Sequence, residues 1–124
     1  MAILTISQKI LTLCSKHPSM GRTVIVIYRP KAGKNQELLQ LVKDHVPILR
    51  SQKLVTDRTP MVMRAADGAI IEVFEWNSSD SIKSAHHNQA VQALWQKFSE
   101  VCDYEMAINV KEFQGIFSEF ETID

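Results

Sequence analysis

The segment from Thr23 to Arg29 constrains the fold more than any other part of the chain. It reads TVIVIYR and is apolar on both sets of alternating positions. Alternating residues of a strand point to opposite sides of its sheet, so this segment predicts a strand that is covered on both faces. Pro30 should end the strand, because proline has no backbone amide to donate to a neighbouring strand.

A helix is expected after this strand. From Gly33 onward, apolar residues recur at steps of three and four, the spacing of an amphipathic helix that ends near Gln52. Pro47 lies inside the pattern, where it removes a backbone donor and crowds the preceding turn. We therefore expect a kink or a restart near Val46.

A hairpin is expected next. Residues 60–65 and residues 69–76 both read as strands, and Asp67-Gly68 between them is a hairpin turn signal. The two strands should therefore pair directly with each other.

A second helical region begins near Ser79, where serine hydroxyls can cap the first turn. Its apolar face changes direction near His87, which predicts a break, and Asn88 is a favourable cap for a restarted helix that runs to about Cys102. Residues 104–111 are then expected to form the last strand.

The resulting order is β-α-β-β-α-β, a ferredoxin-like α+β fold with both helices on one face of a four-stranded antiparallel sheet. The other face lacks a cover, although both alternating sets of the first strand are apolar. The simplest cover is the sheet of a second copy of the chain. We therefore expect a homodimer whose two sheets form an α+β barrel.

Three regions are expected along the chain. Residues 1–22 form an N-terminal extension, either helical or poorly ordered. Residues 23–112 form the α+β barrel domain, which has an ordinary size for a single domain. Residues 113–124 form a tail too apolar to stay in water, so it should dock on the domain or on the partner subunit.

The composition argues against several classes of protein. Apolar residues make up 45% and charged residues 23% of the chain, as in ordinary globular domains. Basic and acidic residues number 14 each, which disfavours binding to nucleic acid or to an anionic membrane. Cys14 and Cys102 do not form a disulfide framework or a zinc motif, and no apolar run has the roughly 20 residues of a membrane span. We expect a cytoplasmic protein without a bound metal.

The segment Glu75–His86 (EWNSSDSIKSAH) resembles a family signature. An acid and an aromatic residue end a strand, and the following helix closes on Ala85-His86. This stretch is similar to the signature of antibiotic-biosynthesis-monooxygenase-like domains, in the dimeric α+β barrel superfamily. The resemblance extends in element order from about Thr23 to Lys111. It implies that fold, in a superfamily that includes cofactor-independent oxygenases of quinols and polyketides, heme-degrading enzymes and isomerases.

The chain departs from two patterns of that superfamily. Where heme-degrading members carry Asn, Trp and His, this chain has Val26, Ala85 and Trp95, which cannot play those parts. Oxygenase-like members often carry a second His and an intervening Pro, where this chain has Val91 and Ala90. The four glycines are isolated, so no phosphate-binding loop is present either. We expect no cofactor.

His86 is the leading candidate for proton transfer, because imidazole titrates near neutral pH and this one is expected at a helix break facing the sheet. Glu75 is the candidate to orient it. The alternative is that His86 packs at the helix end without a chemical role.

Glu72 and Arg64 are candidate substrate-binding residues. Glu72 alternates with Ile70 and Phe74, so its carboxylate is expected on an apolar face. Such an acid either keeps its proton or pairs with Arg64 on the neighbouring strand. A plain structural ion pair and a functional role are both open at this point.

Tyr28 and Trp76 are also candidate substrate-binding residues. Together with Trp95 and Tyr104 they can line a site for a planar molecule, although core packing is the alternative.

Two functions fit this sequence. The first is a cofactor-free monooxygenase acting on a small aromatic or quinol-type molecule in a cavity between sheet and helices. The second is a non-catalytic homodimer that binds a small hydrophobic ligand or another protein. An enclosed pocket of about 300 Å³ or more at which Glu75, Trp76 and His86 converge would favour the first.

Overall fold

The computed structural model describes residues 21–124. The expectation for residues 1–20 lies outside the described residues. The elements are β1 (Arg22–Pro30), α2 (Asn35–Ser51), β2 (Met61–Arg64), β3 (Ile70–Trp76), α3 (Ser79–Ala85), α4 (Gln89–Val101), β4 (Cys102–Tyr104), the 3-10 turns η2 (Ala107–Asn109) and η3 (Lys111–Gln114), and β5 (Glu121–Ile123). The predicted α+β class is confirmed.

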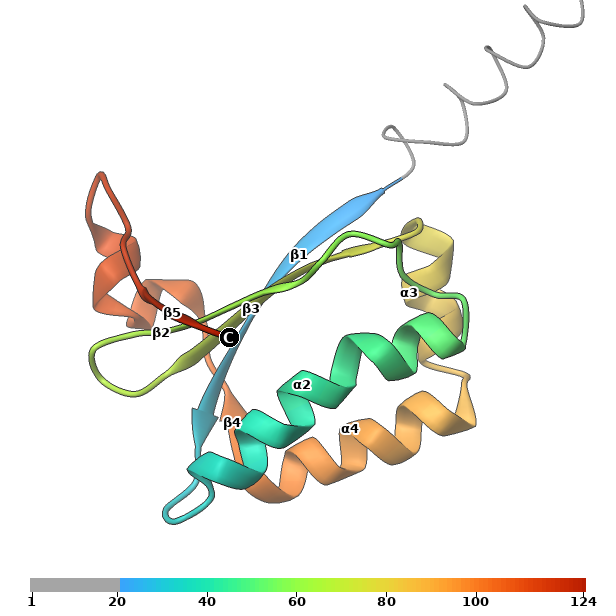
Figure 1. Ribbon diagram of the computed structural model, residues 1–124, viewed down its shortest axis with the longest axis horizontal. Coiled ribbons are helices and arrows are strands. Elements are labelled where there is room, and N and C mark those ends of the chain that lie inside the picture. Colours follow the sequence, from blue (N-terminus) through green and yellow to red (C-terminus); the bar gives the residue numbers. More distant parts are fainter. Residues whose placement is uncertain (1–20) are drawn as a thin grey trace, which may run out of the picture.

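The antiparallel sheet has five strands, in the order β4-β1-β3-β2-β5. The prediction of four strands was therefore one short. The chain after η3 doubles back to the free edge of β2, where β5 pairs antiparallel with it (Figure 1). Pairing satisfies backbone groups that an open edge would expose.

Helices α2 and α4 pack against each other on one face of the sheet (Figure 1). Helix α2 runs through Pro47 without interruption, so the predicted restart does not occur. Val46 and Leu49 are buried while Pro47 is exposed, and this packing outweighs the loss of one helical hydrogen bond. No helix within residues 21–124 is long and apolar enough to cross a membrane.

The predicted break in the second helical region is confirmed. Helix α3 starts at a Ser78 cap, whose hydroxyl accepts from the Ser81 amide. Helix α4 restarts at Asn88, whose side-chain oxygen accepts from the Val91 amide at 3.1 Å. The new helix then directs its apolar stripe toward the sheet.

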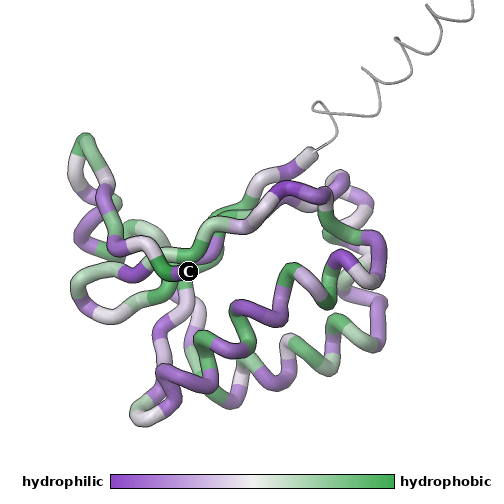
Figure 2. Tube along the Cα trace, in the orientation of Figure 1, coloured by the Kyte–Doolittle hydropathy of each residue, from purple (hydrophilic) through white to green (hydrophobic). Residues whose placement is uncertain are grey.

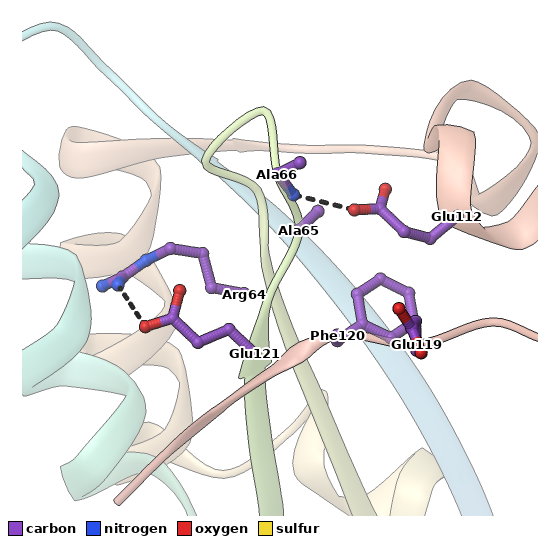
Figure 3. A pocket seen from close by; sticks show the side chains of 7 residues that line it. All are labelled: Arg64, Ala65, Ala66, Glu112, Glu119, Phe120 and Glu121. Atoms are coloured by element: carbon purple, nitrogen blue, oxygen red, sulfur yellow. Dashed lines mark hydrogen bonds and ion pairs between the residues drawn. The ribbon is translucent and has the colours of Figure 1, made fainter.

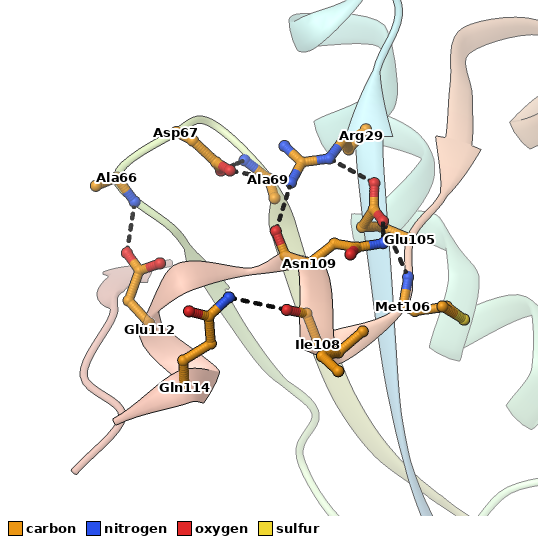
Figure 4. A network of polar contacts seen from close by, with 10 residues as sticks. All are labelled: Arg29, Ala66, Asp67, Ala69, Glu105, Met106, Ile108, Asn109, Glu112 and Gln114. Carbon is orange, nitrogen blue, oxygen red and sulfur yellow. Dashed lines mark hydrogen bonds and ion pairs between the residues drawn. The ribbon is translucent and has the colours of Figure 1, made fainter. Parts of the chain in front are cut away.

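The last strand is much shorter than predicted. Residues 104–111 were expected to be extended, but β4 ends at Tyr104. The guanidinium of Arg29 on β1 binds the carboxylate of Glu105 at 2.7 Å and that of Asp67 at 3.0 Å (Figure 4). Asn109 donates to Glu105 as well, so these contacts turn the chain across the sheet instead of along its edge.

The segment after β4 covers part of the sheet face opposite the helices. Val110 is buried there against Ile27 and Ile71, and Phe113 and Phe120 pack onto the same cluster. The chain itself thus covers part of the sheet face for which we expected the sheet of a partner subunit.

The cover is incomplete. Ile25 and Met61 on the opposite face remain 56% and 61% exposed. In the loop that projects after η3, Ile116 and Phe117 are 95% and 91% exposed. Figure 2 shows this loop as hydrophobic at its tip.

Replacing Asn88 by Ala should lower the free energy of unfolding by about 1 kcal/mol, because the first turn of α4 loses its cap. Urea unfolding followed by circular dichroism measures the change. Gln89→Ala, at an exposed position in the same turn, is the control. Equal stability of the Asn88 variant and the wild type would contradict a capping role.

Candidate functional site

A cavity of about 350 Å³ lies between the sheet and the helices. Strands β1, β3 and β4 form its floor, and α2 and α4 each contribute one side chain. Its lining is aliphatic and aromatic except for one imidazole: Val24, Val26, Tyr28, His45, Phe74, Trp76, Trp95 and Tyr104. The volume falls in the range of small-molecule sites.

Glu72 lies directly beside this cavity and is completely buried. It is central in β3, opposite Val26 in the register with β1. Its Oε1 accepts a hydrogen bond from the Tyr28 hydroxyl at 2.7 Å and contacts Nδ1 of His45 at 2.8 Å. Its Oε2 has no hydrogen-bond partner within residues 21–124. A buried carboxylate requires such partners, because an isolated buried charge is strongly unfavourable.

His45 faces the sheet from α2 and is buried. Its ring packs edge-on against Phe74 and Phe98, each at 5.2 Å between centroids. The indole nitrogen of Trp95 lies 3.4 Å from Nε2. An indole N–H only donates, so Nε2 accepts, and the ring proton of neutral His45 is on Nδ1, facing Glu72.

The arrangement gives the cavity one proton acceptor. Nδ1 of His45 is committed to Glu72, and the lone pair of Nε2, on the other side of the ring, accepts the long hydrogen bond from Trp95, which a bound hydroxyl would have to replace. An imidazole held in this way can remove a proton from a bound hydroxyl and return it later.

Tyr28 acts in this cluster as a donor. Burial, followed by the charge of Glu72 and the hydrogen bond to it, raises the pKa of Tyr28 well above 10. Burial also raises the pKa of Tyr104. Both phenols are therefore neutral at physiological pH.

Four aromatic residues that the sequence singled out do line the cavity. They are Tyr28, Trp76, Trp95 and Tyr104. Glu72 lies behind this lining, in contact with Tyr28. A role for any of them in substrate binding stays a prediction.

Glu75 and His86 are not brought together. The Glu75 side chain lies on the opposite face of β3 from Trp76, with its carboxylate 2.9 Å from Nε of Arg58. His86 is exposed at the end of α3, with its ring 5.2 Å from that of Trp95. His86 is thus close to one wall of the cavity, and its catalytic role is untested.

The alternative pairing of Arg64 with Glu72 is wrong. Arg64 points into a different groove, of about 630 Å³, where its guanidinium lies 3.8 Å from Glu121 on β5 (Figure 3). The fifth strand, which we did not predict, supplies this partner, while α2 supplies the partner of Glu72.

His45 is the residue that sequence reasoning missed. It appeared only as one member of the helical pattern in α2. Glu72 could have pointed to it, because a carboxylate on an apolar strand face needs a buried hydrogen-bond partner. The helix that covers this face has one polar residue on its buried stripe, His45.

Other reactive groups give no site. Burial raises the pKa of the Cys102 thiol to about 11, which keeps it protonated at neutral pH. Residues 21–124 contain no cluster of three or more His, Cys, Asp or Glu side chains placed to hold a metal ion.

Stability at alkaline pH tests the Tyr28–Glu72 contact. The pKa of Tyr28 is raised in the folded chain, so its contribution is complete below the unfolded pKa of about 10 and is lost as pH rises beyond it. Urea unfolding between about pH 8 and pH 11 should show this loss in the wild type and a smaller one in Tyr28→Phe. At neutral pH the variant should be less stable by about 1–2 kcal/mol. Identical pH profiles would contradict the contact.

Two solved structures are similar to this chain in fold. SnoaB, a cofactor-independent oxygenase from Streptomyces nogalater, superposes with a TM-score of 0.58 at 13% identity, over 69% of this chain and 87% of SnoaB. A conserved protein from Methanosarcina mazei Go1 gives a TM-score of 0.54 at 18% identity, over 69% and 85% of the two chains. No protein-family model matches the sequence, and no curated protein matches it. At these identities the comparisons establish the fold that this chain shares with SnoaB.

Proposed function

We propose that this protein is a cofactor-independent monooxygenase of small aromatic molecules that carry an ionisable hydroxyl, such as quinols or anthrones. The substrate lies in the cavity between the sheet and the helices. His45 is the base, and the aromatic side chains around it hold the planar ring.

One observation carries the proposal: a buried imidazole with one nitrogen fixed by a carboxylate borders an otherwise apolar cavity of about 350 Å³. Oxygenation without metal or flavin needs a substrate that donates electrons as its own anion. A base beside an apolar, aromatic-lined pocket meets that need. The fold likeness to SnoaB, an oxygenase described as cofactor-independent, supports the same class.

The steps balance for an anthrone-type substrate, in which a CH2 group lies between two aromatic rings opposite a ketone, so that this keto form and its phenol tautomer give the same anion. His45 Nε2 gives up its long hydrogen bond from Trp95, takes one proton and leaves that delocalised anion. The anion transfers an electron to dioxygen, and the radical pair combines to form a C–O bond. The peroxide oxygen takes the proton back from His45, and loss of water leaves a carbonyl. One oxygen atom enters the product and the other leaves as water.

His86 is the second candidate for the base. Its ring contacts Trp95, which lines the cavity, but the side chain is exposed. Water screens an exposed imidazole and competes for its nitrogen, so the proposal assigns the proton to His45.

Oxygen uptake tests the function and the choice of histidine. The purified, metal-free protein should consume dioxygen with at least one member of a panel of quinols, anthrones and flavonols. His45→Gln should lower kcat by roughly 100-fold or more, because it removes the base. His87→Gln, at an exposed neighbour of His86, is the control, and His86→Gln should retain most activity. Loss of activity in His86→Gln alone would move the base to that residue, and silence across the panel would favour the ligand-binding alternative.

We also propose a homodimer formed through the sheet face opposite the helices. Ile25 and Met61 are large apolar residues left exposed on this face, beside the part that the C-terminal segment covers. Exposed apolar patches of this kind are typical of interfaces, and two-fold dimers are the commonest oligomers.

A single charge on this face should prevent the dimer. Met61→Lys should run as a monomer in size-exclusion chromatography with light scattering, because an unpaired lysine would be buried between the sheets. Gln96→Lys, on the exposed side of α4, adds the same charge elsewhere and should remain a dimer. A monomeric wild type, or a dimeric Met61 variant, would contradict the interface.

A further inference from the structure

Glu72 carries a feature that the proposed reaction does not require. Both of its hydrogen-bonded contacts go to Oε1, at 2.7 and 2.8 Å, and Oε2 is buried without a partner within residues 21–124. Two donors on one oxygen favour the ionised carboxylate. With His45 neutral and Tyr28 protonated, the cluster holds one negative charge beside the cavity.

No opposite charge lines the cavity. Neither lysine nor arginine occurs among its lining residues. The titratable groups facing Glu72 are Tyr28 from β1, His45 from α2 and, at longer range, Tyr104 from β4. Arg64 is on the adjacent strand, but its guanidinium is paired with Glu121. A ligand in the cavity therefore meets an uncompensated negative field.

We propose that Glu72 makes the cavity selective for ligands that arrive neutral and carry a hydroxyl proton, and excludes ligands that arrive as anions. This selection deepens the proposed function and rests on it for the fate of the proton. Binding itself does not depend on oxygen chemistry.

Charge conservation explains the selection. A neutral hydroxyl that gives its proton to His45 leaves the total charge of ligand and cluster unchanged, because the imidazolium gained offsets the anion formed. An anion from solution would instead bring a second negative charge into a site of low dielectric. If the anion lies about 7 Å from Glu72 and the effective dielectric constant is about 20, the repulsion between the two negative charges weakens binding of the anion on the order of ten- to hundredfold.

The contacts of Glu72 also make it a positioning residue. Its hydrogen bond to Nδ1 directs Nε2 of His45 away from the carboxylate, toward Trp95 in the cavity wall. The same carboxylate can stabilise the imidazolium after proton transfer. The charge of Glu72 would therefore both orient the proposed base and disfavour anionic ligands.

Three planar ligands of similar size test the proposal by isothermal titration calorimetry at neutral pH: 2-naphthol, 2-naphthamide and 2-naphthoate. The amide and the carboxylate have nearly the same shape and differ in charge. Wild-type protein should bind 2-naphthol and 2-naphthamide, and should bind 2-naphthoate at least tenfold more weakly than the amide.

The variant Glu72→Gln keeps the side-chain shape and removes the charge, so the difference between amide and carboxylate should shrink to about threefold or less. Glu75→Gln, on the opposite face of the same strand, is the matched control and should keep the wild-type ratio. Circular dichroism shows whether each variant is folded. If Glu72→Gln does not fold, Glu72→Leu removes the same charge and should reduce the ratio in the same way, because desolvation of the carboxylate ligand remains while the repulsion is lost.

Equal or tighter binding of 2-naphthoate by the wild type would overturn the proposal, and so would an unchanged ratio in a folded Glu72→Gln. Failure of both neutral ligands to bind would overturn it too. The test separates the two proposals. If the binding ratios are as expected but no oxygen is consumed, the proposed oxygenase function is rejected and the proposed selectivity is kept. If oxygen is consumed but the amide and the carboxylate bind equally, only the proposed selectivity is rejected.

Discussion

A single buried carboxylate organises the helix-facing side of this protein. Glu72 in β3 joins β1 through Tyr28 and α2 through His45, so one side chain ties together the two central strands and the first helix. Removing one partner of a buried hydrogen-bonded group commonly costs about 1–3 kcal/mol, while replacing both partners by apolar groups of the same shape can be nearly neutral. Stability alone therefore does not account for an acid at this position, and the proposed function would give it a chemical use through its contact with a cavity-lining imidazole.

The opposite face of the sheet depends on a different interaction. Arg29 in β1 binds Glu105 and Asp67, and these contacts lead the chain away from the sheet edge after β4. The segment that follows buries Val110 and ends in β5. These pairs are partly exposed and individually weak, so the apolar cluster beneath them supplies most of the stabilisation. The cavity and the outer cover thus lie on opposite faces of the same strands.

Local patterns in the sequence predicted most of the elements, because each depends on neighbouring residues. The Asp67-Gly68 turn and the Asn88 cap are satisfied by backbone groups within three residues, and both are where we expected them. The errors are long-range. The course of the chain after Tyr104 depends on Arg29, about 80 positions earlier, and no local pattern contains that information. Helix α2 does not restart at Pro47, because tertiary packing outweighs one lost hydrogen bond.

The same distinction explains the site. All four aromatic candidates line the cavity: Tyr28, Trp76 and Tyr104 are strand residues, whose side of the sheet depends on alternation, and Trp95 is on α4. The partner of Glu72 was not predictable in this way, since Arg64 on the adjacent strand and His45 on the covering helix were both within reach of an acid on that face. In the structure Arg64 lies beside Glu121 of β5, and the carboxylate of Glu72 is bonded to His45 of the helix instead. Both contacts join residues far apart in the sequence, so alternation along β2 and β3 could place Glu72 on the helix-facing side but could not identify its partner.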